Sequence, residues 1–261
     1  MVEVIYFAAI GCLAGVLAGL LGIGGGLVIV PLLALVLAPL GFPEEEVMRV
    51  AVATSLATII LTSFSSAYAH HRRGAVEWDV VWRLSLGLVM GALTASYVVT
   101  VLPHGVLKIV FVGFLLLVAY QMLVGVRLRA FQALPQQPWL TGIGGGIGLV
   151  SGVVGIGGGT MIVPFLVACQ TNIRQAVATS SACGFFIALA AVLGFIAVSP
   201  TMALPDGSIG YIYLPAWIVI SAVSVLCAPI GVFLAHHIST DKLKRVFAMA
   251  LVIMASLLLF R

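Results

Sequence analysis

A glycine-rich interruption of a long apolar run occurs twice in this chain and constrains its fold more than any other feature. The first copy is Gly22-Ile23-Gly24-Gly25-Gly26, closed by Pro31, and the second is Gly155-Ile156-Gly157-Gly158-Gly159, closed by Pro164. Residues 15–31 and 148–164 are identical at ten of seventeen positions. A repeated break in an uncharged apolar segment predicts a chain built from two related halves.

Two further motifs are repeated downstream of the breaks. Residues 49–55 return as residues 174–180 with six of seven positions identical, and residues 107–111 align with residues 243–247. The repeat therefore extends over the length of each half. We expect a first transmembrane repeat at residues 1–126, a linker at 127–138 and a second transmembrane repeat at 139–261.

The composition indicates that these halves lie in a lipid bilayer. Hydrophobic residues make up 62% of the chain and charged residues only 8%, against roughly 25% charged residues in soluble domains. The net charge of +4 is too small and too scattered to indicate a nucleic-acid partner. Glu3 stands where a cleavable signal would carry basic residues, so the first apolar segment is expected to remain.

Most of the apolar segments are long enough to cross a bilayer, which takes about 20 residues. Residues 27–37 and 160–169, which follow the breaks, reach only about halfway through a core of roughly 30 Å. The expected helical segments are 4–20, 27–37, 47–69, 80–102, 106–126, 139–154, 160–169, 176–198, 211–235 and 243–260.

The distribution of lysine and arginine decides whether each broken segment crosses the membrane or turns back. If it crosses, the halves are parallel and the twelve basic residues divide six to six between the two sides. If it turns back, the halves are inverted and the division is nine to three, with only Arg49, Lys108 and Arg261 on the poorer side. Because basic residues concentrate in the cytoplasm, we expect an all-α polytopic membrane protein with two inverted repeats. Each repeat then holds a glycine-broken re-entrant helical hairpin plus three transmembrane helices, and both termini lie outside the cytoplasm.

Consecutive glycines at a helix start suit the binding of an anion. They leave backbone amides uncovered, and the first N–H groups and the positive dipole end of the following helix point into the break. Hydroxyls in the downstream Ala-Thr-Ser motifs can add donors. The candidate substrate-binding residues are Gly24, Gly25, Gly26, Thr54, Ser55, Gly157, Gly158, Gly159, Thr179 and Ser180.

Structural roles are the alternatives for these residues. Glycines also let helices pack closely, as the spacing of Gly11, Gly15 and Gly19 and of Gly144, Gly148 and Gly152 indicates. We assign the run of glycines at 142–146 to packing as well. The Thr-Ser hydroxyls can instead bond within their own helix.

Other polar residues give weaker indications. Arg49 and Arg174 either draw anions toward the site or extend their side chains to the membrane surface, and Cys183 lies four residues after Thr179 on the same helix face. The histidine pairs at 70–71 and 236–237 show no converging set of metal ligands, so no metal or other cofactor is expected. All eight carboxylates are expected in the first residues or in loops, which leaves no intramembrane acid as a proton carrier.

The paired breaks ending in Pro31 and Pro164, each followed by Ala-Thr-Ser, resemble the sulfite exporter TauE/SafE family over essentially the whole chain. The resemblance implies a permease of a bacterial or archaeal cytoplasmic membrane that moves sulfite, sulfonates or related anions, often outward. It also implies that the ten candidate residues above form the substrate site.

We therefore expect a secondary transporter that exports a small sulfur-containing anion such as sulfite or an organosulfonate. Na⁺ or H⁺ is the expected coupling ion. The sequence leaves open whether the chain forms a homo-oligomer. The alternatives are a passive small-anion channel and a permease for a non-sulfur organic anion. An intramembrane enzyme or sensor is disfavoured, because no nucleophile–base pair occurs among the spans.

Overall fold

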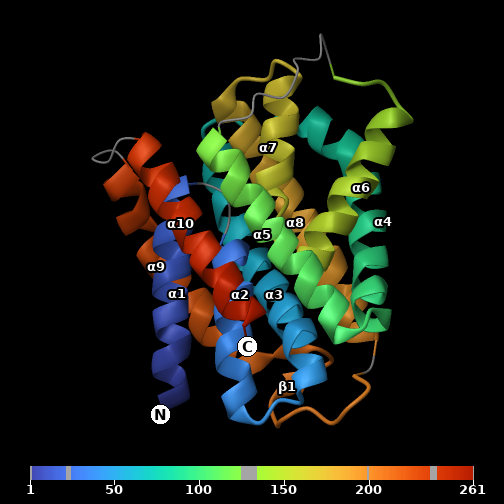
Figure 1. The fold of residues 1–261 in the computed structure, drawn as a ribbon. Helices are drawn as coiled ribbons and strands as arrows, with labels where there is room; N and C mark the ends of the chain where they lie inside the picture. The colour runs from blue at the N-terminus through green and yellow to red at the C-terminus, as the bar shows by residue number, and fades with distance from the viewer. Residues whose placement is uncertain (1, 22–24, 125–133, 199, 236–239, 261) are drawn as a thin grey trace.

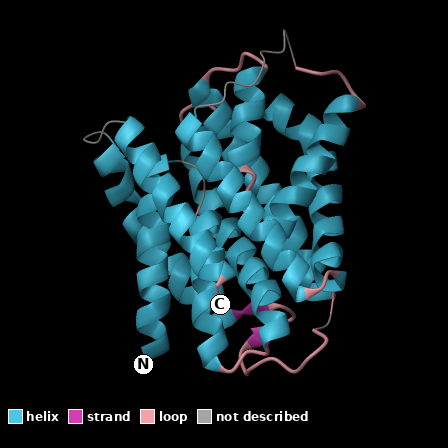
Figure 2. Ribbon diagram, viewed as in Figure 1, coloured by secondary structure: helices cyan, strands magenta, loops and turns pink. Residues whose placement is uncertain are grey.

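The computed structural model describes the chain except residues 1, 22–24, 125–133, 199, 236–239 and 261 (Figure 1). Gly24, His236, His237 and most of the expected linker at 127–138 therefore lie outside the described residues. Within the described chain the structure is almost entirely helical, and Figure 2 shows one short pair of strands among the helices. These strands, β1 (Ser208–Ile209) and β2 (Ile212–Tyr213), are antiparallel.

Four described helices are long and apolar enough to cross a membrane, namely α3 (Glu44–His71), α4 (Trp78–Val101), α5 (His104–Val124) and α8 (Ile173–Ala197). Shorter apolar segments lie in α1 (Val2–Leu21), α2 (Gly26–Leu37), α6 (Trp139–Val154), α7 (Gly159–Ala168), α9 (Leu214–Ala235) and α10 (Thr240–Leu259), and a 3₁₀ turn, η1 (Ala38–Leu40), follows α2. A helix satisfies its own backbone hydrogen bonds, which lipid cannot do. The expected all-α polytopic membrane protein is confirmed.

Large apolar side chains cover much of the outside of the bundle. Leu86, Ile109 and Leu226 are 64%, 65% and 75% exposed, respectively. Apolar surface on this scale suits a lipid environment rather than water.

The start of α1 and the end of α2 lie at the same end of the molecule. The ring of Tyr213 packs edge-on against Phe7, near the start of α1, with centroids 6.0 Å apart, and against Phe42, just after α2, at 5.0 Å. In Figure 1 the N-terminus and β1 lie together at this end. The α1–α2 pair therefore turns back instead of crossing the molecule.

The second break is arranged in the same way at the opposite end. Just before α6, the side-chain amide of Gln137 donates to the carbonyl of Arg83 near the start of α4. At the start of α8, which follows α7, Thr179 accepts a hydrogen bond from Glu77, just before α4. The α6–α7 pair thus starts and ends close to where α4 begins.

The helices of the two halves pack against one another reciprocally. By their order in each half, α1 corresponds to α6 and α4 corresponds to α9. Helix α1 lies along α9, and α6 lies along α4 in the same way. Helices α3 and α8 also pack together, as do α5 and α10. Such reciprocal pairing is what two halves related by a two-fold axis would make.

Glycines allow the closest of these approaches. A Cβ on Gly15 would lie 2.4 Å from the carbonyl oxygen of Ser224 in α9, and one on Gly148 would lie 2.3 Å from that of Leu88 in α4. The packing role predicted for these glycines is confirmed. Residues 142–146 lie within α6, and Gly144 likewise approaches the carbonyl oxygen of Leu84.

The expectation that every carboxylate lies in the first residues or in a loop was wrong for five of them: Glu44, Glu45 and Glu46 lie in the first turn of α3, Asp79 in the first turn of α4 and Asp241 at the start of α10. Helix α3 begins at Glu44, just after Pro43, and the Glu46 side chain is fully buried. Proline is tolerated at the start of a helix and acidic residues favour its positive end, so the three glutamates extend α3. Glu44 and Glu45 remain exposed as expected.

Candidate functional site

The two glycine breaks meet in the core of the bundle. A Cβ on Gly26, the first residue of α2, would lie 2.5 Å from the carbonyl oxygen of Gly155 and 3.1 Å from the Cα of Ile156. The same Cβ would lie 3.0 Å from the Cδ1 of Ile59 in α3. The backbones of the two breaks are therefore in direct contact, and only a residue without a side chain fits between them.

The second break depends on glycine for its backbone conformation as well. Gly155 ends α6 with φ +77° and donates its N–H to the carbonyl of Ser151, and Gly158 precedes α7 with φ +75°. Both lie in the left-handed region that glycine adopts without strain. Gly157, between them, faces Ile59 of α3, and its carbonyl lies against Gly184 of α8.

The described part of the first break differs from the second. Gly25, which aligns with Gly158, has φ −71°, and its Cβ position faces Ala14 and Ile29 at 3.2 Å. Gly25 therefore lies between α1 and α2 rather than toward the other break, and Gly26 makes the contact between the breaks. Gly159, its counterpart, is the buried first residue of α7.

Each short helix presents its start to this central region. In α2 the amides of Val28 and Ile29 donate to the carbonyl of Gly25. In α7 the amides of Met161 and Ile162 donate to the carbonyl of Gly158. Among the described residues, no backbone carbonyl accepts from the earlier amides of either helix, as is usual for the first N–H groups of a helix. Both helix starts thus supply N–H groups and a positive dipole end close to the breaks.

The two threonines of the repeated motifs bond to the other half of the chain. The Thr54 hydroxyl accepts from the backbone N–H of Tyr213 at 3.1 Å, and the Thr179 hydroxyl accepts from that of Glu77 at 3.1 Å. Neither bond is the intrahelical one considered as an alternative. Each threonine anchors the backbone just before a helix, and these bonds leave its hydroxyl hydrogen unused.

Ser55 connects its helix directly to the second break. Its hydroxyl donates to the carbonyl of Gly155 at 3.0 Å, and both residues are buried. Ser180, its counterpart, is 3% exposed. The residue that corresponds to Gly155 is Gly22, which lies outside the described residues.

The two arginine candidates lie near the starts of their helices, whereas Cys183 is next to Gly184, which lies against the carbonyl of Gly157 in the second break. Arg174 is exposed near the start of α8, where its backbone N–H bonds to the side chain of Asn172. Cys183 is completely buried within α8. Arg49 is only 8% exposed and lies near the start of α3.

Arg49 forms a buried ion pair with Glu46 at 3.0 Å. Its Nε donates to the carbonyl of Val99 at 3.3 Å and its Nη2 to that of Leu102 at 3.0 Å, so it caps the C-terminal end of α4. The other carboxylate oxygen of Glu46 accepts from the hydroxyl of Thr201, in the loop before β1. Arg49 is thus held in a buried network, which is neither of the two roles considered from the sequence.

Tyr211 lies in the same region and is completely buried. Burial raises the pKa of its hydroxyl, and the negative charge of Glu46 raises that pKa further. The hydroxyl therefore stays protonated and neutral at pH 7.

Two hydroxyl residues near the breaks were not singled out from the sequence. The Thr160 hydroxyl, directly after the second break, is buried without a hydrogen-bond partner among the described residues. The Ser63 hydroxyl would lie 3.1 Å from a Cβ on Gly184 and 3.7 Å from one on Gly157. The signal for Ser63 was its spacing, because Ser55, Ile59 and Ser63 follow one another at four-residue intervals on one helix face.

Fold and site together define a polytopic helical membrane protein in which two glycine-broken hairpins bring uncovered backbone into the core. A family model described as sulfite exporter TauE/SafE matches residues 7–258. The chain belongs to the sulfite exporter TauE/SafE family.

Several curated relatives carry names of the same kind. One from Haemophilus influenzae, named "Probable membrane transporter protein", is 36% identical over 250 residues, which cover 94% of this chain and 94% of the relative. One from Methanocaldococcus jannaschii with a similar name is 27% identical over 256 residues, covering 96% and 93%. No solved structure matches the chain. Family and relatives indicate a membrane transporter rather than an enzyme.

Proposed function

We propose that this chain is a secondary transporter that exports a small sulfur-containing anion, such as sulfite or an organosulfonate, across the cytoplasmic membrane of a prokaryote. The observation that carries the proposal is the contact between the two breaks, where Gly26 meets Gly155 and Ile156. The anion is held between these breaks, with Na⁺ or H⁺ as coupling ion.

The chemistry of the breaks suits an anion that must be released again. Removing an anion from water is costly, so donors that are already oriented are needed to offset that cost. The early amides of α2 and α7, the helix dipoles and the unpartnered Thr160 hydroxyl supply such donors without a fixed countercharge. The described residues at the breaks carry no charged side chain, which favours weak binding and rapid exchange.

Contact between the breaks also suits alternating access. Gly26 and Gly155 lie too close for a ligand to pass between them, so the structure corresponds to a closed arrangement. Separation of the α1–α2 hairpin from the α6–α7 hairpin opens the space that the anion occupies. Motion of one repeat against the other around a central site is a common mechanism in transporters with inverted repeats.

Flux measured in proteoliposomes tests this function. Purified protein is expected to move sulfite, thiosulfate and methanesulfonate in preference to acetate and lactate, and to accumulate at least one sulfur anion against its gradient when a Na⁺ or pH gradient is imposed. Strictly downhill flux under every gradient would identify a passive channel instead. A preference for the carboxylates would identify a permease for a non-sulfur organic anion.

Both termini are expected outside the cytoplasm. The start of α1 lies at the end of the molecule that holds Arg49 and Lys108, whereas Arg72, Arg73, Arg83 and Arg174 lie toward the opposite end. The end rich in basic residues is expected to face the cytoplasm. A phosphatase that is active only outside the cytoplasm should therefore be active when fused after Arg261. A fluorescent protein that fluoresces only in the cytoplasm should be dark at the same position. The reverse pattern would contradict this orientation.

A further inference from the structure

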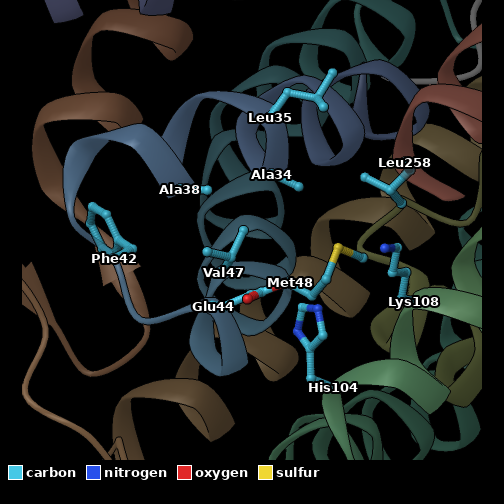
Figure 3. A pocket seen from close by; sticks show the side chains of 10 residues that line it. All are labelled: Ala34, Leu35, Ala38, Phe42, Glu44, Val47, Met48, His104, Lys108 and Leu258. Carbon is cyan, nitrogen blue, oxygen red and sulfur yellow. The ribbon is translucent and has the colours of Figure 1, made fainter. Parts of the chain in front are cut away.

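A cavity of about 320 Å³ lies away from the breaks, at the end of the molecule where α2, α3, α5 and α10 come together. Most of its wall is apolar, with Ala34, Val47 and Leu258 among the lining residues. Figure 3 shows Lys108, His104 and Glu44 arranged around Met48 at this cavity. Its volume is in the range of sites for small organic molecules.

Lys108 brings a positive charge to this apolar wall. The residue is partly buried, and no carboxylate among the described residues lies within ion-pair distance of its ammonium group. Glu44 lines the same cavity, but its side chain is exposed. A cation that is partly removed from water gains most from a counterion.

His104 supplies a second unsatisfied group on the same helix. Its Nδ1 is buried and has no hydrogen-bond partner within the described chain. Residues four apart on a helix share a face, so His104 and Lys108 are directed to one side of α5. Buried nitrogen atoms in proteins nearly always have a partner, and an oxygen bound between these two residues would provide one.

We propose that this cavity is an outer anion-binding vestibule on the transport path, and this proposal rests on the proposed function. It takes a small organic monoanion, with the anionic oxygens between Lys108 and His104 and a short alkyl part against Ala34, Val47 and Leu258. The Glu44 carboxylate at the rim repels a second negative charge, so a monoanionic sulfonate binds better than a dianion such as sulfate. The vestibule concentrates the anion at the membrane surface, apart from the central site.

Site-resolved labelling of Lys108 tests binding without requiring transport. Purified protein in lipid nanodiscs is acetylated with acetic anhydride, and the labelling of Lys108 is followed by peptide mass spectrometry during titration with methanesulfonate. We expect saturable protection that reaches about tenfold at ten times Kd, while Lys242 in the same sample is unaffected. Sulfate should protect less than methanesulfonate. Equal protection by chloride at the same ionic strength, or none by any anion, would overturn the proposal.

Transport variants give a second, independent readout. Lys108→Met is expected to raise the KM for methanesulfonate about tenfold to a hundredfold, the loss typical of one hydrogen bond to a charged group, with little change in maximal flux. Lys108→Arg should largely restore the KM, and Arg83→Met, which removes an exposed cation near the opposite end, should leave it unchanged. If the wild type moves anions but Lys108→Met has a normal KM, the vestibule is disproved. If labelling is protected although no anion is transported, the vestibule stands and the proposed function fails.

Discussion

Replacing Gly26 by alanine should abolish transport while most of the protein still folds. The added methyl group would lie 2.5 Å from the carbonyl oxygen of Gly155 and 3.0 Å from Ile59, in the contact between the two breaks. Overpacking of this kind costs about 1–3 kcal/mol in a core. Flux per folded molecule is the quantity to measure, in proteoliposomes, with folded protein quantified by size-exclusion chromatography.

Gly15→Ala is the matched control for this variant. Its methyl group would lie 2.4 Å from the carbonyl oxygen of Ser224, in the contact between α1 and α9. This overlap is as severe as that of the Gly26→Ala methyl group with Gly155. We expect comparable loss of stability but nearly normal flux per folded molecule. Equal flux per folded molecule in the two variants would place the substrate elsewhere. Gly158 is less suitable, because its φ of +75° makes any side chain strained regardless of function.

Replacing Arg49 by methionine should lower the free energy of unfolding by about 3–5 kcal/mol, the usual cost of removing one partner from a buried ion pair. The substitution leaves the fully buried Glu46 carboxylate without its cation and removes donors from the carbonyls of Val99 and Leu102. Thermal and denaturant unfolding in detergent, followed by tryptophan fluorescence, measure the change.

Two comparisons separate the charge of Glu46 from general disruption at this position. Adding Glu46→Gln to Arg49→Met removes the uncompensated charge, so the double variant should be more stable than Arg49→Met alone. Arg83→Met breaks the exposed pair with Asp79 and should cost only about 0–1 kcal/mol. If Arg49→Met is no more harmful than Arg83→Met, the buried network contributes little to stability.

The helices could be predicted from the sequence because apolar length, glycine and proline act locally. Residues 139–154 were expected to form a helix and form α6, which ends where Gly155 adopts a left-handed conformation. The short helices after the breaks begin and end within one residue of the expected positions. The start of α3 was missed because a run of glutamates resembles an aqueous loop, although acidic residues also stabilise the first turn of a helix.

Contacts between distant residues could not be predicted in this way. The sequence marked Thr54 and Ser55 by their repetition, but it did not show that Thr54 bonds to Tyr213 or that Ser55 bonds to Gly155. The buried Glu46 is paired with Arg49, three residues further along the same helix, but its second carboxylate oxygen accepts from Thr201, which is remote in the chain. Such partners are fixed by tertiary packing, and one sequence alone contains no periodic signal for them.

The reciprocal packing of the halves has a consequence for biosynthesis. Helix α1 leaves the ribosome well before α9, and its glycine face is completed only when α9 has been synthesised. Until then the face around Gly11 and Gly15 is covered by lipid or by the insertion machinery. The amide of Tyr213, which Thr54 binds, also arrives late. Insertion into the membrane and completion of the fold are therefore separate events, and the first half cannot reach its final packing before the second half is made.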